Sequence, residues 1–254
     1  MNSATDVVCL CVVKKKHKRG KKWIKVILAI VGILVLAEIF ALIWLANSVG
    51  QYKKFWEKKA QESGEITYLA LGDSAAQGIG ASRPTRGYVG LIADKLAEQT
   101  NKSVKVVNIS KTGAKMNDYL TEQAPMIEGR KADIVTIEIG ANDIAVFNAD
   151  DFRSNFKKVL ATLPDGAYVS NMPLFNSRPG STNNAKIASK IIEEELENYP
   201  KLVFVDLQKQ TSDHQSIFGF APDLFHPNNL SYKNWADAFW LKIEKNYEET
   251  QTQN

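Results

Sequence analysis

The sequence predicts an α/β fold in which helices cover both faces of a mostly parallel five-stranded sheet, preceded by a transmembrane helix. Five short β-branched runs alternate with longer amphipathic segments, which is typical of βαβ units. Two of these runs, VKVVNI and IVTIEI, are almost continuously apolar, as expected for strands that are buried on both faces. Ahead of them, 21 nearly uninterrupted apolar residues follow a cluster of cations.

The first predicted element is the apolar run Val26–Ala46, which contains one charged residue, Glu38. At about 1.5 Å per helical residue this run spans roughly 31 Å, close to the ~30 Å hydrocarbon core of a bilayer. The first 50 residues carry eight basic and two acidic residues, and all eight cations precede the run. The positive-inside rule therefore predicts a basic cytoplasmic segment at 1–25, a single-pass signal anchor at 26–46 in the cell membrane, and an extracytoplasmic remainder.

A cleaved signal peptide is the alternative to an anchor. Ala46-Asn47-Ser48 offers small residues at a suitable spacing for cleavage after Ser48, and the protein would then be secreted. The apolar run exceeds the usual length of about 7–15 residues in signal peptides, which favours the uncleaved anchor. Cys9 and Cys11 precede the span, and we expect them to be free thiols in the reducing cytoplasm.

The positive net charge reflects the orientation of the predicted membrane segment and does not indicate an acidic binding partner. The chain carries +4 overall, from 32 Lys+Arg and 28 Asp+Glu. The first 50 residues carry +6, so the other 204 residues hold 24 basic and 26 acidic side chains, a net charge of −2. A faintly acidic domain has no electrostatic basis for binding nucleic acid, and no nucleic-acid partner is expected.

We expect one extracytoplasmic domain at 66–248, between a polar, charge-mixed stalk or linker at 47–65 and a short tail at 249–254. The β-branched runs predict strands at Ile66–Leu71, Val104–Ile109, Ile134–Ile139, Ala167–Asn171 and Leu202–Val205. The amphipathic segments predict helices near Gly87–Thr100, Met116–Glu128, Asp151–Leu163, Asn184–Glu197 and Ser231–Glu248.

Three polar motifs follow predicted strands or precede the last helix. The sequence GDS places Ser74 directly after the first strand, GAND places Asn142 after the third, and DLFH places Asp223 and His226 before the final helix. Each motif alone is more often a turn or a helix cap. Because the carboxyl ends of parallel strands meet at one edge of a sheet, together they predict a nucleophilic serine, a histidine base and an orienting carboxylate.

This combination resembles the SGNH (GDSL-type) hydrolase family over roughly Ile66–Lys245. LGDSAAQGIG is similar to the family's first block, with Ser74 as nucleophile, and NISKTGAKMND to the second, with Gly113 supplying a backbone N–H. GANDI is similar to the third block, with Asn142 as a side-chain donor. DLFHPNNLSY is similar to the fifth block, with Asp223 and His226.

The resemblance implies a flavodoxin-like three-layer α/β/α fold and hydrolysis of a carboxylic ester through an acyl-serine intermediate. It implies a triad of Ser74, Asp223 and His226, with an oxyanion hole formed by Ser74, Gly113 and Asn142. No metal or cofactor is required, and the sequence indicates none. Ser231-Tyr232 replaces the family's frequent Gly-Tyr pair, and Ala75-Ala76 follows the serine in place of the usual apolar-Thr/Ser. The resemblance therefore does not define the shape of the acyl pocket.

Two substrates are consistent with this chemistry: a lipid or lysophospholipid, favoured by the membrane tether, and an O-acetylated cell-wall or other polysaccharide, favoured by the outer location. The other functions that we considered are a non-catalytic surface binding module and an acyltransferase that uses the same serine. His214 lies in a predicted polar loop without a strand end beside it, so we do not expect it to be the catalytic histidine.

Overall fold

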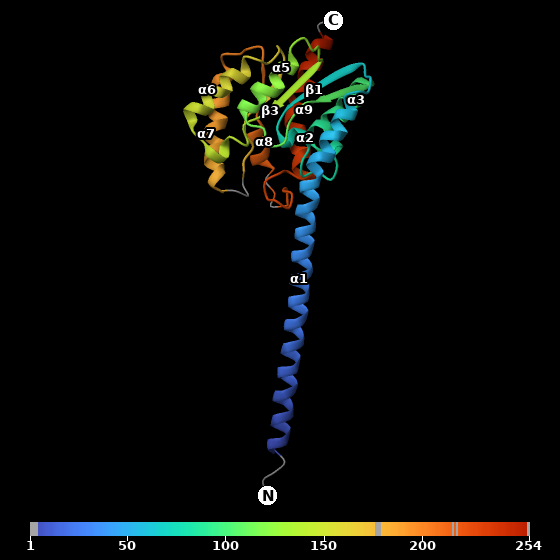
Figure 1. Cartoon of the computed structure of the whole chain (residues 1–254), viewed down its shortest axis with the longest axis vertical. Coiled ribbons are helices and arrows are strands. Elements are labelled where there is room, and N and C mark those ends of the chain that lie inside the picture. The colour runs from blue at the N-terminus through green and yellow to red at the C-terminus, as the bar shows by residue number, and fades with distance from the viewer. Residues whose placement is uncertain (1–4, 176–178, 215, 217, 253–254) are drawn as a thin grey trace. The chain divides into compact units, whose positions relative to one another are not determined.

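The computed structural model describes residues 5–175, 179–214, 216 and 218–252 (Figure 1). The chain divides into two compact units, Met1–Trp44 and Leu45–Asn254. No side chain before Lys22 is described, so the predicted free thiols Cys9 and Cys11 lie outside the described side chains.

The predicted apolar segment lies in one long helix, α1 (Thr5–Lys59). Its part from Lys22 onward contains a stretch with a mean hydropathy of 3.0 and no buried residue, and its large side chains are exposed, with Trp23 at 66% and Phe40 at 71%. In the part of the chain that the structure describes, this is one helix long and apolar enough to cross a membrane. Insertion into a membrane stays a prediction.

The predicted sheet is confirmed. Its strands are β1 (Ile66–Gly72), β2 (Val104–Asn108), β3 (Ile134–Glu138), β4 (Tyr168–Ser170) and β5 (Val203–Val205). They lie in the order β2-β1-β3-β4-β5, and every neighbouring pair is parallel. Each strand starts and ends within two residues of its predicted position, since continuous runs of β-branched residues mark buried parallel strands clearly.

Helices cover both faces of this sheet, and the side chains of β1 show how. Tyr68 and Ala70 point to a core shared with α3 (Tyr88–Thr100) and α9 (Asn229–Thr252). Leu69 and Leu71 point to the opposite core. That core is formed with a group of helices that includes α6 and α7, which pack side by side (Figure 1). The helices on this face are α4 (Met116–Asp118), η2 (Tyr119–Gln123), α5 (Ala124–Ile127), α6 (Ala149–Leu160) and α7 (Pro179–Leu196).

Several predicted segments differ from the structure; the helix predicted near Asn184–Glu197 begins five residues earlier, at Pro179. The helix expected at 116–128 is divided into α4, the π-helical η2 and α5, because Pro125 in the first turn of α5 lacks the N–H that a continuous helix needs. Residues after β5, expected to be a loop, form α8 (Leu207–Asp213), whose first turn is capped by Asp206 accepting from the backbone N–H of Lys209. The remaining short elements are α2 (Ser74–Gln77), η1 (Pro84–Arg86) and η3 (Ile144–Val146).

Candidate active site

Ser74 is the first residue of α2 and lies directly beyond the carboxyl end of β1. Gly72 ends that strand with a φ of +132°, and a Cβ there would lie 2.0 Å from the carbonyl oxygen of Glu138 on β3. Only glycine fits this close approach of two backbones. Asp73 then caps α2 by accepting a 2.9 Å hydrogen bond from the N–H of Ala75. The turn therefore fixes the serine at the sheet edge, where it is 4% exposed.

The loop before α9 brings His226 to Ser74. The Nε2 atom of His226 lies 2.9 Å from the Oγ atom of Ser74, although 152 residues separate them. On the other side of the ring, Nδ1 lies 2.5 Å from Oδ2 of Asp223. Asp223 also uses Oδ1 to accept from the backbone N–H groups of Phe225 and His226, both at 3.0 Å. Leu224, with a φ of +54°, provides the left-handed turn between them.

The electrostatics of this pair favour an ionised Asp223. Its half-burial opposes ionisation, but the hydrogen bond and charge of His226, together with the two backbone N–H donors, outweigh it and lower its pKa. A carboxylate held in this way accepts a hydrogen bond from the N–H at Nδ1. The Nε2 atom then has a free lone pair that accepts a hydrogen bond from the serine hydroxyl.

Asn142 and Gly113 lie beside the same sheet edge but are engaged differently. The Nδ2 atom of Asn142 donates to Oδ2 of Asp73 at 3.1 Å and to the carbonyl of Ala114 at 3.0 Å. Acceptors on both sides fix the orientation of this amide. Gly113, with a φ of +78°, precedes Ala114 in the loop between β2 and α4, and nothing lies within 4 Å of an added Cβ. Asn142 is thus tied to Asp73 and to the residue that follows Gly113, and the role of both as oxyanion donors stays a prediction.

A second carboxyl group, on Glu138 at the end of β3, lies beneath the serine turn and was missed by the sequence analysis. Among the described residues, neither oxygen of Glu138 has a hydrogen-bond partner at the usual distance and angle. The Asp73 carboxyl is nevertheless close enough to interact with it electrostatically. Burial, with the Asp73 charge, raises the pKa of Glu138 well above its usual value, and burial raises the pKa of Asp73 to about 6. Two adjacent buried carboxyl groups do not both ionise, so Glu138 is the neutral partner.

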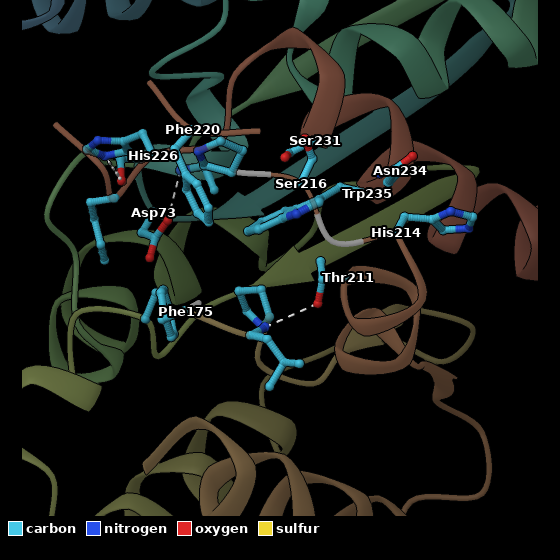
Figure 2. Close-up of a pocket in the computed structure, with 17 residues that line it drawn as sticks. Asp73, Phe175, Thr211, His214, Ser216, Phe220, His226, Ser231, Asn234 and Trp235 are labelled. Atoms are coloured by element: carbon cyan, nitrogen blue, oxygen red, sulfur yellow. Dashed lines mark hydrogen bonds between the residues drawn. The ribbon is translucent and has the colours of Figure 1, made fainter. Parts of the chain in front are cut away.

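A mostly apolar pocket opens beside Ser74 and His226. Its walls include Leu174, Phe175, Phe220, Phe225 and Trp235. Figure 2 shows His226 and His214 at opposite ends of this pocket, with Trp235 between them.

His214 is placed differently from the prediction. It follows the last residue of α8, which begins shortly after the end of β5, and it lines the pocket. The Ser74 hydroxyl is nevertheless hydrogen-bonded to His226. Among the described residues, no group of three or more His, Cys, Asp or Glu is arranged to hold a metal ion.

Several solved structures share this fold. LAE5, an α/β hydrolase from the metagenome of Lake Arreo, has a TM-score of 0.59 at 18% identity, over 71% of this chain and 96% of that one. Axe2, an acetylxylan esterase from Geobacillus stearothermophilus, has a TM-score of 0.58 at 20% identity, over 71% and 95%. TesA has a TM-score of 0.58 at 19% identity, over 70% and 98%. At such identities the likeness confirms the predicted hydrolase-type fold.

Two sequence comparisons concern the family. The spore germination lipase LipC of Bacillus licheniformis is 33% identical over 82 residues, 31% of this chain. The match spans about two fifths of that relative's length, 39%. Residues 70–233, which run from β1 into α9 and include every motif described above, match the GDSL-like lipase/acylhydrolase family. The chain therefore belongs to this family.

Proposed function

We propose that the chain is a membrane-anchored serine esterase in which Ser74, His226 and Asp223 form the catalytic triad. The observation that carries the proposal is the continuous hydrogen-bonded chain from the Ser74 hydroxyl through both ring nitrogens of His226 to Asp223, at 2.9 and 2.5 Å. Nε2 takes the hydroxyl proton as Oγ attacks the ester carbonyl carbon, and the π electrons of the C=O bond move to its oxygen, which becomes an oxyanion. The protonated ring then gives its proton to the leaving alcohol, which departs and leaves an acyl-serine.

Deacylation repeats these steps with water as the nucleophile. His226 takes a proton from the water, the hydroxide oxygen attacks the acyl carbon, and the proton passes to Ser74 Oγ as the carboxylic acid leaves. The backbone N–H groups of Ser74 and Gly113 and the amide of Asn142 are the proposed oxyanion donors. Each such donor is worth about 3–4 kcal/mol of barrier lowering, or 10²–10³ in rate.

The apolar walls of the pocket suit the acyl part of an ester. The name of the structural neighbour Axe2, an acetylxylan esterase, points to an acetyl group. We therefore favour an O-acetylated polysaccharide or another small acyl ester over a lipid with a long chain.

An uncleaved anchor at 26–46 agrees with the packing around the alternative cleavage site. Ser48 is 1% exposed, and its hydroxyl donates to the carbonyl of Leu45 within the continuous helix α1. Leu45 itself is 6% exposed and belongs to a buried cluster. Cleavage after Ser48 would remove Leu45 from the folded domain.

The experiment for the catalytic proposal compares the full chain with Ser74→Ala on p-nitrophenyl acetate, butyrate and decanoate. We expect hydrolysis that falls with acyl length, a loss of about 10³-fold or more in the variant, and one covalent adduct of a fluorophosphonate probe at Ser74. Equal rates for the two proteins, with no adduct, would support the binding-module alternative. Acyl transfer to a sugar in preference to water would support the acyltransferase.

The experiment for the anchor is separate. After carbonate extraction we expect the intact chain in the membrane fraction, and protease added outside should remove residues beyond about 50. A soluble mature form that begins at Val49 would support the cleaved signal peptide.

A further inference from the structure

The end of α1 packs one face against the catalytic domain. Leu45, Ser48, Tyr52 and Trp56 follow one another at three- and four-residue spacing, and each is 6% exposed or less. Residues at that spacing share one face of a helix. The predicted polar stalk or linker at 47–65 therefore contributes a buried helix face to the domain unit that begins at Leu45.

Tyr52 holds the loop that supports His226. Its hydroxyl donates a 2.6 Å hydrogen bond to the carbonyl of Ala81, and its ring packs in a buried cluster that includes Leu45 and Ile79. The neighbouring Gly80 lies so close to the His226 loop that an added Cβ would be 2.9 Å from His226 Cβ. Any shift of the Gly80–Ala81 backbone is therefore passed directly to the histidine.

Trp56 holds the other side of the site. Its Nε1 donates a 3.0 Å hydrogen bond to the carbonyl of Gln77, the last residue of the helix that Ser74 begins. The side chain of Gln77 in turn donates to the carbonyl of Ser110 at 3.0 Å and accepts from the backbone N–H of Thr112 at 3.1 Å. Thr112 directly precedes Gly113, so Trp56 supports the serine turn and the loop of a proposed oxyanion donor together.

We propose that the Leu45–Lys59 part of α1 aligns the active site, with Tyr52 and Trp56 acting as positioning residues for the ester hydrolysis proposed above. Tyr52 donates to the loop that lies against His226, and Trp56 donates to the last residue of α2, whose side chain contacts the loop that leads to Gly113. Both accepting groups are backbone carbonyls, so the side chains on α1 supply the specificity of the contact. Burial raises the pKa of Tyr52 to about 12, so its hydroxyl remains a donor throughout the pH range of an esterase assay.

The test uses the full chain in detergent micelles and compares Tyr52→Phe and Trp56→Phe with wild type. Tyr52→Phe removes one hydroxyl and keeps the ring, so the fold is retained. Lys54→Ala is the matched control, because Lys54 is an exposed residue of the same helix segment. The measurements are kcat and KM on p-nitrophenyl acetate, the rate of fluorophosphonate labelling of Ser74, and the Tm.

We expect each phenylalanine variant to lower kcat and the labelling rate by about three- to tenfold, with KM within about twofold, because a small misalignment of catalytic groups lowers the rate of the chemical step. Lys54→Ala should behave as wild type. An unchanged kcat and labelling rate per folded molecule, measured well below a lowered Tm, would show that the contacts serve stability alone and would overturn the proposal.

Ser74→Ala, assayed in parallel, separates this outcome from failure of the proposed function. If wild type is no faster than Ser74→Ala, the esterase proposal fails and the positioning role fails with it. If wild type is faster and Tyr52→Phe and Trp56→Phe equal it, the esterase proposal stands and only the positioning role is refuted.

Discussion

Replacing Gly80 with alanine is expected to separate His226 from Ser74. Gly80 has a φ of +95°, and an added Cβ would lie 2.3 Å from the carbonyl oxygen of Pro227 and 2.9 Å from Cβ of His226. Ordinary contact begins at 3.4 Å, so the His226 loop must move by about 1 Å. The hydrogen bond from the serine hydroxyl to Nε2 is 2.9 Å long between heavy atoms, and a shift of that size breaks it.

The expected loss follows from this displacement. A misplacement of about 1 Å in a catalytic group costs roughly 10²-fold in rate, so kcat on p-nitrophenyl acetate should fall by about that factor. Alanine at a positive φ also costs about 1–2 kcal/mol of folding free energy, which lowers Tm by roughly 2–8 °C in a domain of this size.

Gly129→Ala is the matched control for that backbone strain. Gly129 has a φ of +73°, nothing lies within 4 Å of its added Cβ, and it lies in the loop before β3. Both variants should lose the stability that a positive φ costs, and Gly80→Ala should lose more because of its clash with the His226 loop. Only Gly80→Ala should lose most of its activity per folded molecule and its labelling by a fluorophosphonate. If the two retain equal activity per folded molecule, the steric link between Gly80 and the histidine is refuted.

Three further predictions concern the carboxylates. Asp223→Asn keeps acceptor oxygen for the turn but loses the charge that orients the imidazole, so kcat should fall by about 10³–10⁴; a loss below tenfold would contradict that role. The folded-state pKa of Glu138 is raised, so its stabilising contribution is complete below the unfolded pKa of about 4.5 and is lost as pH rises through the folded value. Glu138→Gln does not titrate, so its Tm relative to wild type should increase from pH 4.5 to pH 8, and a pH-independent difference would contradict a neutral Glu138. Arg153 lies 2.5 Å from the buried carboxylate of Glu195, whose other cation, Lys157, is 3.5 Å away. Arg153→Ala should therefore cost about 1–2 kcal/mol in thermal unfolding, allowing for its partial exposure, and leave kcat unchanged.

The strands were predictable because parallel strands buried on both faces leave a strong local signal. The division of the 116–128 helix was less visible, since Pro125 is compatible with the first turn of a new helix as well as with a kink. The sequence did not indicate that Tyr52 and Trp56 pack against the domain, because both lie in a charge-mixed segment directly after a long apolar run. Which face of such a helix is buried depends on the partner surface.

The polar site was predictable only in part for a related reason. The short distance between Asp223 and His226 is local, and the motif DLFH encodes it. The contact between Ser74 and His226 joins positions 152 residues apart, so it depends on the order of strands in the sheet. Glu138 did leave a signal, a lone acid in the apolar run IVTIEI, but its meaning depends on Asp73 lying on the adjacent strand end.

Asn142 shows how the resting site differs from the site during proposed catalysis. Both N–H groups of its amide are used, one by Asp73 at 3.1 Å and one by the Ala114 carbonyl at 3.0 Å. An oxyanion must displace one of these acceptors. Hydrogen bonds to a charged acceptor are about twice as strong as neutral ones, so we infer that the Ala114 bond gives way and the Asp73 bond stays. In the proposed mechanism the Asn142 donor is then gained only as negative charge develops, which stabilises the transition state more than the bound ester.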